Sequence, residues 1–592
     1  MDDGSTAIAA GRRGEEAGQR EVGPGRRSGR PAPPRQWLVR AAAAISAVAA
    51  AATLAFTVAT AYRLHVPLPY WDEWYNILHF RSFAEGRYGL ADLASQHNEH
   101  RLLVPRLFFF ADEMGFRLSG LFDLTVTFVL QAANAAILIL LMRRGVARSA
   151  PRLLLVGFVL LLLFTLRQEQ NFTNGFQLQF VGVFTAAALA ALAYGAALER
   201  FGAGRRRASL PFFALAALAS AVSAYTMANG VMTGFVLAVA ALLRGAPLRV
   251  PLATALLSLL LAALFFHGYV PGGGSLPAGE IPSHLLAYPR FVTAYLGNPL
   301  GDDLRAAQAL GLVGLGLAAA AAFSVATGRR RDAEGLVLLT VAGFILATAA
   351  VTAYGRVAAG SHQAFESRYA TPSLIFWCAI VLFWFPALVR PGRATLGAIA
   401  LGTLMLLLGL AACWSEATAW PALAARTAAL RHVADSLLAG LYDAEAAGTY
   451  ENTTAEEVVG FAPFLREHRL AVFAGADYAA LGRPLEPLAP AGSCAGTVVA
   501  RADPALGADG VRLSGTARDA ATRRAPTRLF VTAAGRVVGF GSASVPGVPS
   551  RLWTGYAKAR PGDALQAVAQ RPDGSLCTIG EAVVASPDPA GG

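Results

Sequence analysis

The chain has 592 residues, of which 55% are hydrophobic and 15% are charged, and its mean hydropathy is positive. This composition excludes an ordinary assembly of soluble domains and predicts a membrane protein. The net charge of +12 comes almost entirely from arginines in short clusters between apolar runs, a pattern typical of membrane topology, so we expect no nucleic-acid partner.

The first 36 residues are rich in Gly, Pro, Arg and Glu and have no apolar periodicity, which predicts a disordered cytoplasmic tail. The apolar run from about Trp37 to Tyr62 is longer than the core of a signal peptide, so it is interpreted as a retained first span. Since a helix needs about 20 apolar residues to cross a bilayer, the sequence predicts eleven spans, of which the third, fifth and sixth are short. They lie near residues 40–62, 121–142, 153–167, 178–198, 209–226, 229–243, 249–268, 306–327, 335–354, 371–389 and 394–413.

With a cytoplasmic N-terminus, every predicted inner loop is basic and nearly free of acids, as the positive-inside rule requires. The predicted fold is therefore mainly α: a polytopic bundle of about 11 spans in the cell membrane over residues 37–413. An odd number of spans places the C-terminal region outside the cell, as a helical connector (414–484) and a β-rich domain (485–592) that resembles a small β-sandwich. Cys494 and Cys577 bracket this domain and form either a disulfide or two free buried thiols.

The first outer loop, residues 63–120, is too long for a simple connection and too apolar to be disordered. Its stretch "PLPYWDEWYNILHF" (67–80) predicts a helix from Asp72 to about Glu85, and a second helix is predicted from Glu99 to Gly115, both lying in the membrane interface. Asp72 could be only a helix cap and Glu73 only a solvated acid of the first turn. The flanking Trp71 and Trp74, the position directly after the first span and a second polar cluster nearby favour a site instead.

That second cluster is "HNEHR" (97–101). His97 and His100 could meet on one helical face and bind a metal with Glu99 or Asp72, but the spacing matches no specific zinc motif. The alternative is a hydrogen-bonded helix start capped by Asn98. We therefore predict no metal site.

Two further outer loops carry polar residues at span ends. The loop 168–177 contains Glu169 and Asn171, and the loop 355–370 contains Arg356 and ends with Arg368 and Tyr369. An arginine at the interface is suited to holding a phosphate through paired hydrogen bonds. The alternative is an arginine that only contacts lipid headgroups. For Arg356 this explanation accounts for the residue as well as phosphate binding does, and for Arg368 it does so less well.

The arrangement of spans, the acidic "WDEW" directly after the first span and the C-terminal outer domain resemble the GT-C superfamily of integral-membrane glycosyltransferases over roughly residues 40–415. The resemblance implies transfer of a sugar, with inversion, from a polyprenyl-phosphate donor to a cell-envelope glycan or a lipid acceptor. It implies that Asp72 is the general base and that Glu73 orients the acceptor or a metal. No cofactor is firmly expected, although a divalent cation (Mg or Mn) is possible in such enzymes. For the donor phosphate, the resemblance suggests Arg368 as the first cation, with Tyr369 beside it, and Arg101 and Arg356 as alternatives. It also implies a substrate pocket formed by residues of the outer loops: Trp71, Trp74, His97, Asn98, Glu99, His100, Glu169 and Asn171.

Two other functions stay open. A transporter or flippase of envelope lipids would carry charges in the middle of its spans, and a non-enzymatic membrane scaffold would leave the polar cluster of the first loop without a role. If the enzyme interpretation holds, Asp72, His97, His100, Glu169 and Arg368 should converge on one cavity.

Overall fold

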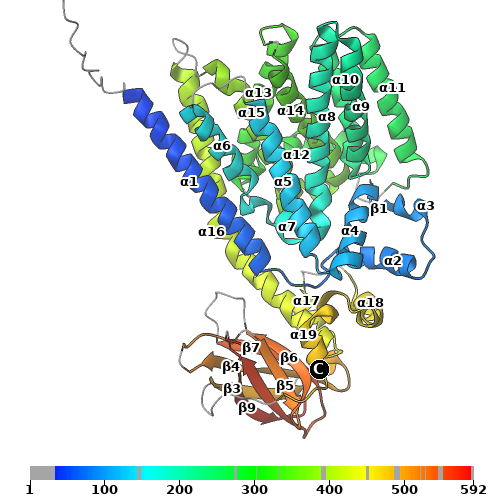
Figure 1. Ribbon diagram of the computed structural model, residues 1–592, viewed down its shortest axis with the longest axis vertical. Coiled ribbons are helices and arrows are strands. Elements are labelled where there is room, and N and C mark those ends of the chain that lie inside the picture. The colour runs from blue at the N-terminus through cyan, green and yellow to red at the C-terminus, as the bar shows by residue number, and fades with distance from the viewer. Residues whose placement is uncertain are drawn as a thin grey trace, which may run out of the picture.

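Three parts make up the computed structural model of this chain: a helical bundle, a helical connector and a β-domain (Figure 1). The predicted disordered tail falls outside the described residues except for its last three, which begin the first helix. The structure describes residues 34–142, 149–271, 276–301, 303–330, 332–388, 395–448, 453–485, 494–520, 522–526, 528–543, 551–571 and 573–587.

Ten helical segments of the described residues are long and apolar enough to cross a membrane, by length and composition. The prediction of a mainly helical membrane protein is therefore confirmed. Each of the eleven predicted spans lies on a helix, but the sixth belongs to a shorter apolar stretch, Ala228–Leu243. The helices of the bundle are α1 (Pro34–Arg63), α5 (Leu121–Leu141), α6 (Ser149–Leu163), α7 (Glu169–Thr173), α8 (Leu178–Gly202), α9 (Arg206–Ala224), α10 (Met232–Leu243), α11 (Arg249–Phe266), α12 (Ala287–Leu296), α13 (Leu304–Ala326), α14 (Ala333–Arg356), α15 (Ala370–Leu388) and α16 (Thr395–Leu438).

Central and peripheral helices of the bundle differ in how much of their surface they bury. α15 is buried along most of its length and contributes Trp377 and Phe383 to the core, whereas α1 and α11 bury only a small part of theirs. α1 and α6 approach each other closely at Gly157 of α6. A Cβ atom at this position would lie only 2.5 Å from Oγ of Ser46 in α1, so the close approach depends on glycine. Without water to drive association, helices in a membrane depend on such close packing.

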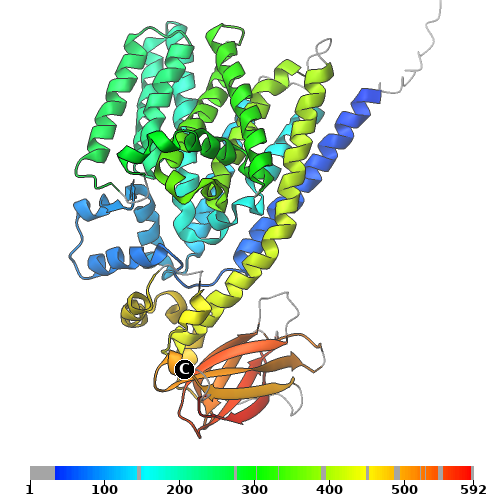
Figure 2. The ribbon, with the colours of Figure 1, turned by 180° about the vertical axis from the view of Figure 1, so that it is seen from behind.

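Between α1 and α5 the chain forms a ledge, residues 64–120, against the end of the bundle nearest the β-domain (Figures 1 and 2). We call this end of the bundle the ledge end. α2 (Glu73–Ala84) begins directly after Asp72, close to the predicted helix. The second helix was predicted to begin at Glu99, but α4 (Leu103–Phe116) begins four residues later. Between them lie α3 (Leu90–Leu93) and the two short strands β1 (Gln96–His97) and β2 (His100–Arg101).

The connector begins without a break in the last bundle helix, so the predicted division near residue 414 falls inside a continuous helix. α16 is a single helix of 44 residues that continues beyond the bundle toward the β-domain (Figure 2). It is followed by α17 (Ala444–Ala447), α18 (Ala455–Glu467) and α19 (Ala476–Ala480). Trp74 and Phe80 of α2 pack with Phe461 and Phe464 of α18, which joins the ledge and the connector in one apolar cluster.

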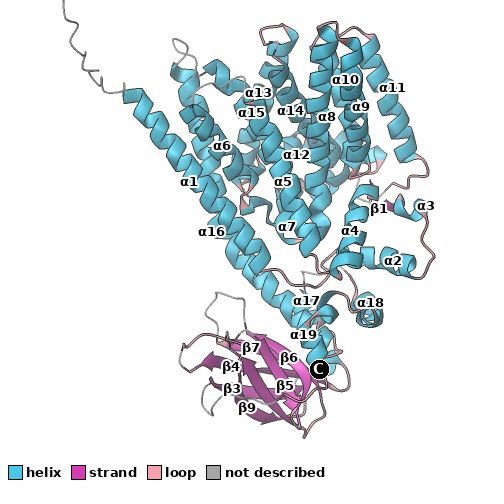
Figure 3. Ribbon diagram, in the orientation of Figure 1, coloured by secondary structure: helices cyan, strands magenta, loops and turns pink. Residues whose placement is uncertain are grey.

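The β-domain is one antiparallel sheet of seven strands in the order β3-β4-β7-β6-β5-β8-β9 (Figure 3). The domain is β-rich as predicted, but a single curled sheet takes the place of the expected sandwich. With seven alternating strands, the first and last run in the same direction, and they meet: Cys494 is disulfide-bonded to Cys577, and Arg501 forms a parallel bridge with Ala585. The strands are β3 (Cys494–Ala502), β4 (Gly510–Asp519), β5 (Arg528–Ala533), β6 (Arg536–Ala543), β7 (Leu552–Lys558), β8 (Ala564–Gln570) and β9 (Leu576–Val583).

Asp435 of α16 and Asp443, which caps α17, attach the β-domain to the connector. Asp435 accepts a hydrogen bond of 2.8 Å from Oγ of Ser542. Asp443 accepts one of 2.6 Å from the hydroxyl of Tyr556 and lies 2.7 Å from Nη1 of Arg512. These bonds satisfy carboxylates that would be costly to bury alone, so they orient the domain on the connector.

Candidate functional site

Most of the predicted site residues come from four segments that meet at the ledge end of the bundle, and Arg356 ends α14. The ledge supplies Trp71 and Asp72 and the hairpin of β1 and β2. The chain between α6 and α8 contributes α7, flanked by the 3-10 turns at Leu166–Gln168 and Gly175–Gln177, and the turn Ser367–Tyr369 precedes α15. Contacts between these segments bring together residues that are up to about 300 positions apart.

Asp72 occupies the N-cap position of α2, but its side chain makes no capping hydrogen bond there. Its Oδ2 lies 3.8 Å from Nε2 of His97, and the Asp72 side chain is 35% exposed. The His97 ring is buried, with its centroid 4.5 Å from that of Tyr75 and 5.4 Å from that of Phe176. Asp72 is thus a carboxylate that solvent reaches, backed by a fixed imidazole.

Glu73 has a different environment from its neighbour. Its Oε2 accepts a hydrogen bond of 2.8 Å from the backbone N–H of Tyr70, and its Oε1 accepts one of 3.1 Å from the backbone N–H of Phe176. A Cβ atom at Gly175 would lie 3.1 Å from the same Oε1, so a larger residue there would crowd this contact. Glu73 therefore joins the ledge to the segment between α7 and α8.

The "HNEHR" stretch is a hairpin, so its interpretation as a helix start is wrong. His97 and His100 are paired residues of β1 and β2, and Asn98 adopts a φ of +48°, which asparagine tolerates better than most residues. The two histidines consequently do not share a helical face. Among the described residues, no group of three or more His, Cys, Asp or Glu side chains is placed to hold a metal ion.

His100 is held in its neutral form. Its Nδ1 is 3.3 Å from the backbone N–H of Ala228, from which it accepts a hydrogen bond. Burial, with smaller contributions from the neighbouring His97 and Arg356, lowers the pKa of His100 to about 4, although Glu99 opposes the shift. The imidazole is therefore uncharged at neutral pH.

Two of the predicted phosphate-binding arginines already have partners. Arg101 donates from all three of its guanidinium nitrogens to backbone carbonyls, those of Ala94 (2.9 Å), Phe265 (2.6 Å) and His267 (2.5 Å). It therefore ties the hairpin to the end of α11. Nη2 of Arg356 lies 3.2 Å from Oε2 of Glu99 in a partly exposed ion pair.

Arg368 differs from these arginines. In the part of the chain that the structure describes, its guanidinium makes no hydrogen bond and no ion pair, and only two aromatic rings contact it. Its Cζ lies 5.9 Å from the centroid of the Trp71 ring and 5.5 Å from that of Tyr369. Trp71 directly precedes Asp72, so the arginine and the carboxylate share this neighbour. An arginine stacked on aromatic rings keeps its N–H edge free for an anion.

The turn that carries Arg368 is fixed by side chains of α7. The amide of Asn171 donates to the backbone oxygen of Arg368 (3.0 Å) and to Oγ1 of Thr371 (2.8 Å). Oε1 of Glu169 accepts a hydrogen bond of 3.0 Å from Oγ of Ser367. Asn171 is completely buried, so it and Glu169 position the site rather than line it.

The sequence analysis missed Arg426, which lies in α16 far beyond the predicted spans. Its Nη1 is 3.1 Å from Oε2 of Glu169, it donates to Oγ1 of Thr173, and its Cζ lies 5.4 Å from the centroid of Tyr70. The available signal was an arginine in the helical patterning that continues past the last predicted span, with Arg431 five residues later. Arg426 connects the connector helix to α7 and to the ledge.

Two aromatic residues predicted for the site are parts of the packing instead. Trp74 is 2% exposed, and its ring stacks on that of Phe461 with 6.0 Å between centroids. Tyr369 is also buried, against Tyr295 and Phe180. Their rings stabilise the ledge and the bundle core, respectively.

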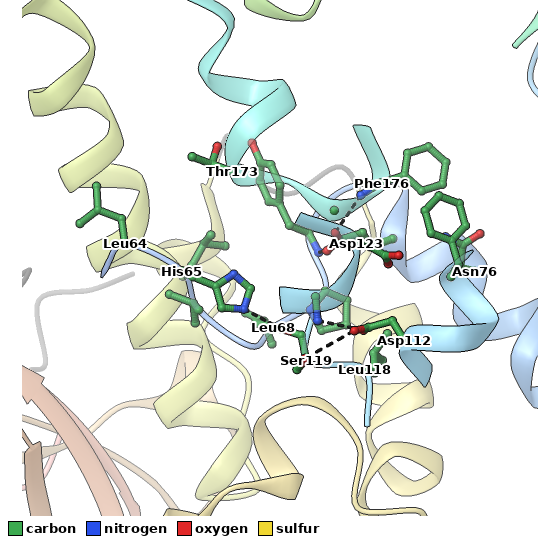
Figure 4. A pocket seen from close by; sticks show the side chains of 18 of the residues that line it. Leu64, His65, Leu68, Asn76, Asp112, Leu118, Ser119, Asp123, Thr173 and Phe176 are labelled. Carbon is green, nitrogen blue, oxygen red and sulfur yellow. Dashed lines mark hydrogen bonds between the residues drawn. The ribbon is translucent and has the colours of Figure 1, made fainter. Parts of the chain in front are cut away.

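A cavity of about 50 Å³ is lined by Glu73 and by three acids that the sequence analysis did not single out, Asp112, Glu113 and Asp123 (Figure 4). Asp112 accepts a hydrogen bond of 2.9 Å from the backbone N–H of Gly120, whereas neither carboxylate oxygen of the buried Glu113 has a hydrogen-bond partner among the described residues. Burial, followed by the nearby Asp123 and Asp112, raises the pKa of Glu113 well above its ordinary value. Since one water needs at least about 10–15 Å³, the cavity accommodates a few waters and is too small for a sugar. None of the five residues that were expected to converge on one cavity, Asp72, His97, His100, Glu169 and Arg368, lines it.

Comparison with protein-family models, with curated proteins and with solved structures found no match to this chain.

Proposed function

We propose that this protein is a membrane glycosyltransferase that moves a sugar from a polyprenyl-phosphate donor to a glycan or lipid acceptor of the cell envelope, with its site at the ledge end of the bundle. In this proposal the ledge and the β-domain face the outside of the cell and the N-terminal tail faces the cytoplasm.

The observation that carries the proposal is the pairing of a carboxylate with an arginine that has no acidic partner among the described residues. Asp72 is partly exposed and directly follows Trp71, and the guanidinium of Arg368 lies over the ring of that tryptophan. Sugar transfer from a lipid phosphate needs these two elements: a base for the acceptor hydroxyl and a cation for the departing phosphate.

In the proposed reaction, Asp72 takes the proton of the acceptor hydroxyl while the hydroxyl oxygen attacks the anomeric carbon. The bond between that carbon and the phosphate oxygen breaks, and its electron pair leaves with the lipid phosphate. Arg368 stabilises the negative charge that develops on this phosphate. Attack from the face opposite the leaving group inverts the anomeric centre.

The neighbouring groups are suited to positioning these two residues. His97 lies 3.8 Å from Asp72 and restricts where the carboxylate can point. Asn171 and Glu169 hold the turn of Arg368 through its backbone and through Ser367. Glu73, which was expected to orient the acceptor, is occupied by two backbone N–H groups, so the proposal gives it no chemical step.

The test is turnover by the purified full-length protein with a panel of radiolabelled polyprenyl-phosphate sugars, with and without Mg²⁺ or Mn²⁺. We expect Asp72→Asn and Arg368→Ala each to reduce transfer at least about 100-fold, the lower range for loss of a general base or of an electrostatic contact. Glu85→Gln, at the exposed end of α2, and Arg117→Ala, in the exposed part of the ledge, are the matched controls.

Full activity of Asp72→Asn would overturn the assignment of the base. A protein that transfers no sugar from any donor but moves labelled lipid across proteoliposome membranes would be a flippase. A protein with neither activity would fit the scaffold interpretation.

A further inference from the structure

A crevice of about 360 Å³ lies between α8, α9, α10 and α11, on the side of the bundle away from α1 and α16 (Figure 1). Small side chains make room for it on one wall, where α9 contributes Ala216 and Ala217. The facing wall on α11 is formed by Leu257 and Leu261. None of the residues of the proposed transfer site lines this crevice.

The length of the crevice matches one leaflet of a membrane. Arg249 and Leu261 both line it and are 12 residues apart on α11. At 1.5 Å per residue this separation spans about 18 Å, slightly more than half of a hydrocarbon core of about 30 Å. An extended acyl chain from one leaflet therefore fits along it.

One end of the crevice is positively charged. The Cζ of Arg249 lies 5.4 Å from the centroid of the Phe201 ring, and the Cζ of Arg206 lies 5.9 Å from the same centroid. Within the described residues, neither guanidinium has an acidic partner. Both arginines are at the first turn of their helices, α11 and α9, at the end of the bundle opposite the ledge. This is the depth at which a lipid headgroup would lie.

The polar side chains within the crevice do not require a polar ligand. The hydroxyl of Tyr194 and Oγ1 of Thr254 are 2.8 Å apart and hydrogen-bond to each other across it, and Ser258 donates to the backbone oxygen of Thr254. The occupant is therefore expected to be apolar along the crevice and anionic at one end.

We propose that the crevice binds one phospholipid with a net negative headgroup, with one acyl chain along α9 and α11 and the phosphate at Arg249 and Arg206. Guanidinium groups bind phosphate oxygens through charge-assisted hydrogen bonds, and the contact is stronger beside a low-dielectric membrane than in water. A zwitterionic lipid would fit the crevice but would gain less from the two arginines.

The test uses the full-length protein, delipidated in detergent and then incubated with equal amounts of phosphatidylglycerol and phosphatidylcholine with identical chains. Native mass spectrometry counts the lipids that stay bound. We expect the wild type to retain phosphatidylglycerol preferentially and Arg249→Gln to reduce that preference about fivefold, as for loss of one basic side chain near an anionic lipid. Arg207→Gln, an equal change of charge at an exposed neighbour of Arg206, should leave the preference unchanged.

A second pair of variants tests the acyl chain independently of charge. Ala217→Phe fills the crevice and should reduce retention of both lipids, whereas Ala214→Phe, on the exposed face of the same helix, should not. Equal retention of both lipids by the wild type would overturn the proposal. So would an equal effect of Arg249→Gln and Arg207→Gln, or unchanged retention by Ala217→Phe.

Discussion

The carboxylate of Glu73 accepts a hydrogen bond from the backbone N–H of Phe176, with 3.1 Å between Oε1 and the nitrogen, although 103 residues separate the two. Asp72, one position earlier, instead has Oδ2 3.8 Å from His97. Two adjacent acids thus have different surroundings: Glu73 connects two segments of backbone, and Asp72 is left partly accessible beside an imidazole.

The first prediction separates these neighbours by stability. Glu73→Gln should lower the free energy of unfolding by about 1–3 kcal/mol, because a glutamine has one accepting oxygen for two buried N–H donors. Asp72→Asn should change the free energy of unfolding by less than about 0.5 kcal/mol, because Asp72 is partly exposed and makes no capping hydrogen bond. Thermal unfolding in detergent measures both, and equal destabilisation by the two variants would contradict the assignment.

The second prediction concerns acidification of the ledge. Burial and the adjacent Arg106, whose Nη2 is 3.3 Å from Nε2 of His79, lower the pKa of His79 from 6.5 to about 4. Between these values His79 binds more protons in the unfolded chain than in the folded one, so this histidine contributes a decrease in the free energy of unfolding as the pH falls from about 6.5 to about 4. His79→Gln should weaken this dependence without abolishing it, because His100 titrates over the same range. Chemical denaturation at a series of pH values provides the measurement.

The third prediction has the opposite sign and concerns Glu113. Since its pKa is raised in the folded state, Glu113 holds a proton in the folded protein that it has lost in the unfolded chain at neutral pH, and the contribution of this residue to stability should fall as the pH rises above about 4.5. Glu113→Gln removes this titration and can donate to the nearby carboxylates. Its melting temperature should exceed that of the wild type at pH 7 to 8, and the two should converge near pH 4. A lower melting temperature at pH 8 would show that the carboxyl is charged and stabilising.

The fourth prediction concerns the seam of the β-domain between β3 and β9. The disulfide of Cys494 and Cys577 closes a loop of 83 residues, so Cys494→Ser should destabilise the domain by about 2–5 kcal/mol. Fluorescence of the buried Trp553 in β7, followed during denaturation with and without a reducing agent, reports on this domain. The control is the bundle, whose unfolding should be insensitive to the reductant.

Local patterns were sufficient for much of the architecture. An apolar run of about 20 residues can satisfy its backbone only within a helix once it is in a membrane, so all eleven predicted segments are helical whatever surrounds them. The start of α2 after Asp72 was also predicted, although the Asp72 side chain makes no capping hydrogen bond there. Even the continuity of α16 past residue 414 was partly visible, since helical patterning was predicted on both sides of that position.

The sequence by itself therefore determined that this is a helical membrane protein with a β-rich C-terminal part, and that polar residues gather beside the first span. Only the tertiary structure decided what each of them does. Arg101 donates hydrogen bonds to backbone carbonyls at the end of α11, and Glu73 accepts one from the backbone N–H of Phe176. Glu169 forms an ion pair with Arg426 of α16. The physical reason is that a charge at a membrane boundary is stabilised by whichever partner the fold brings within about 3 Å, and a partner a hundred or more residues away leaves no trace in local sequence.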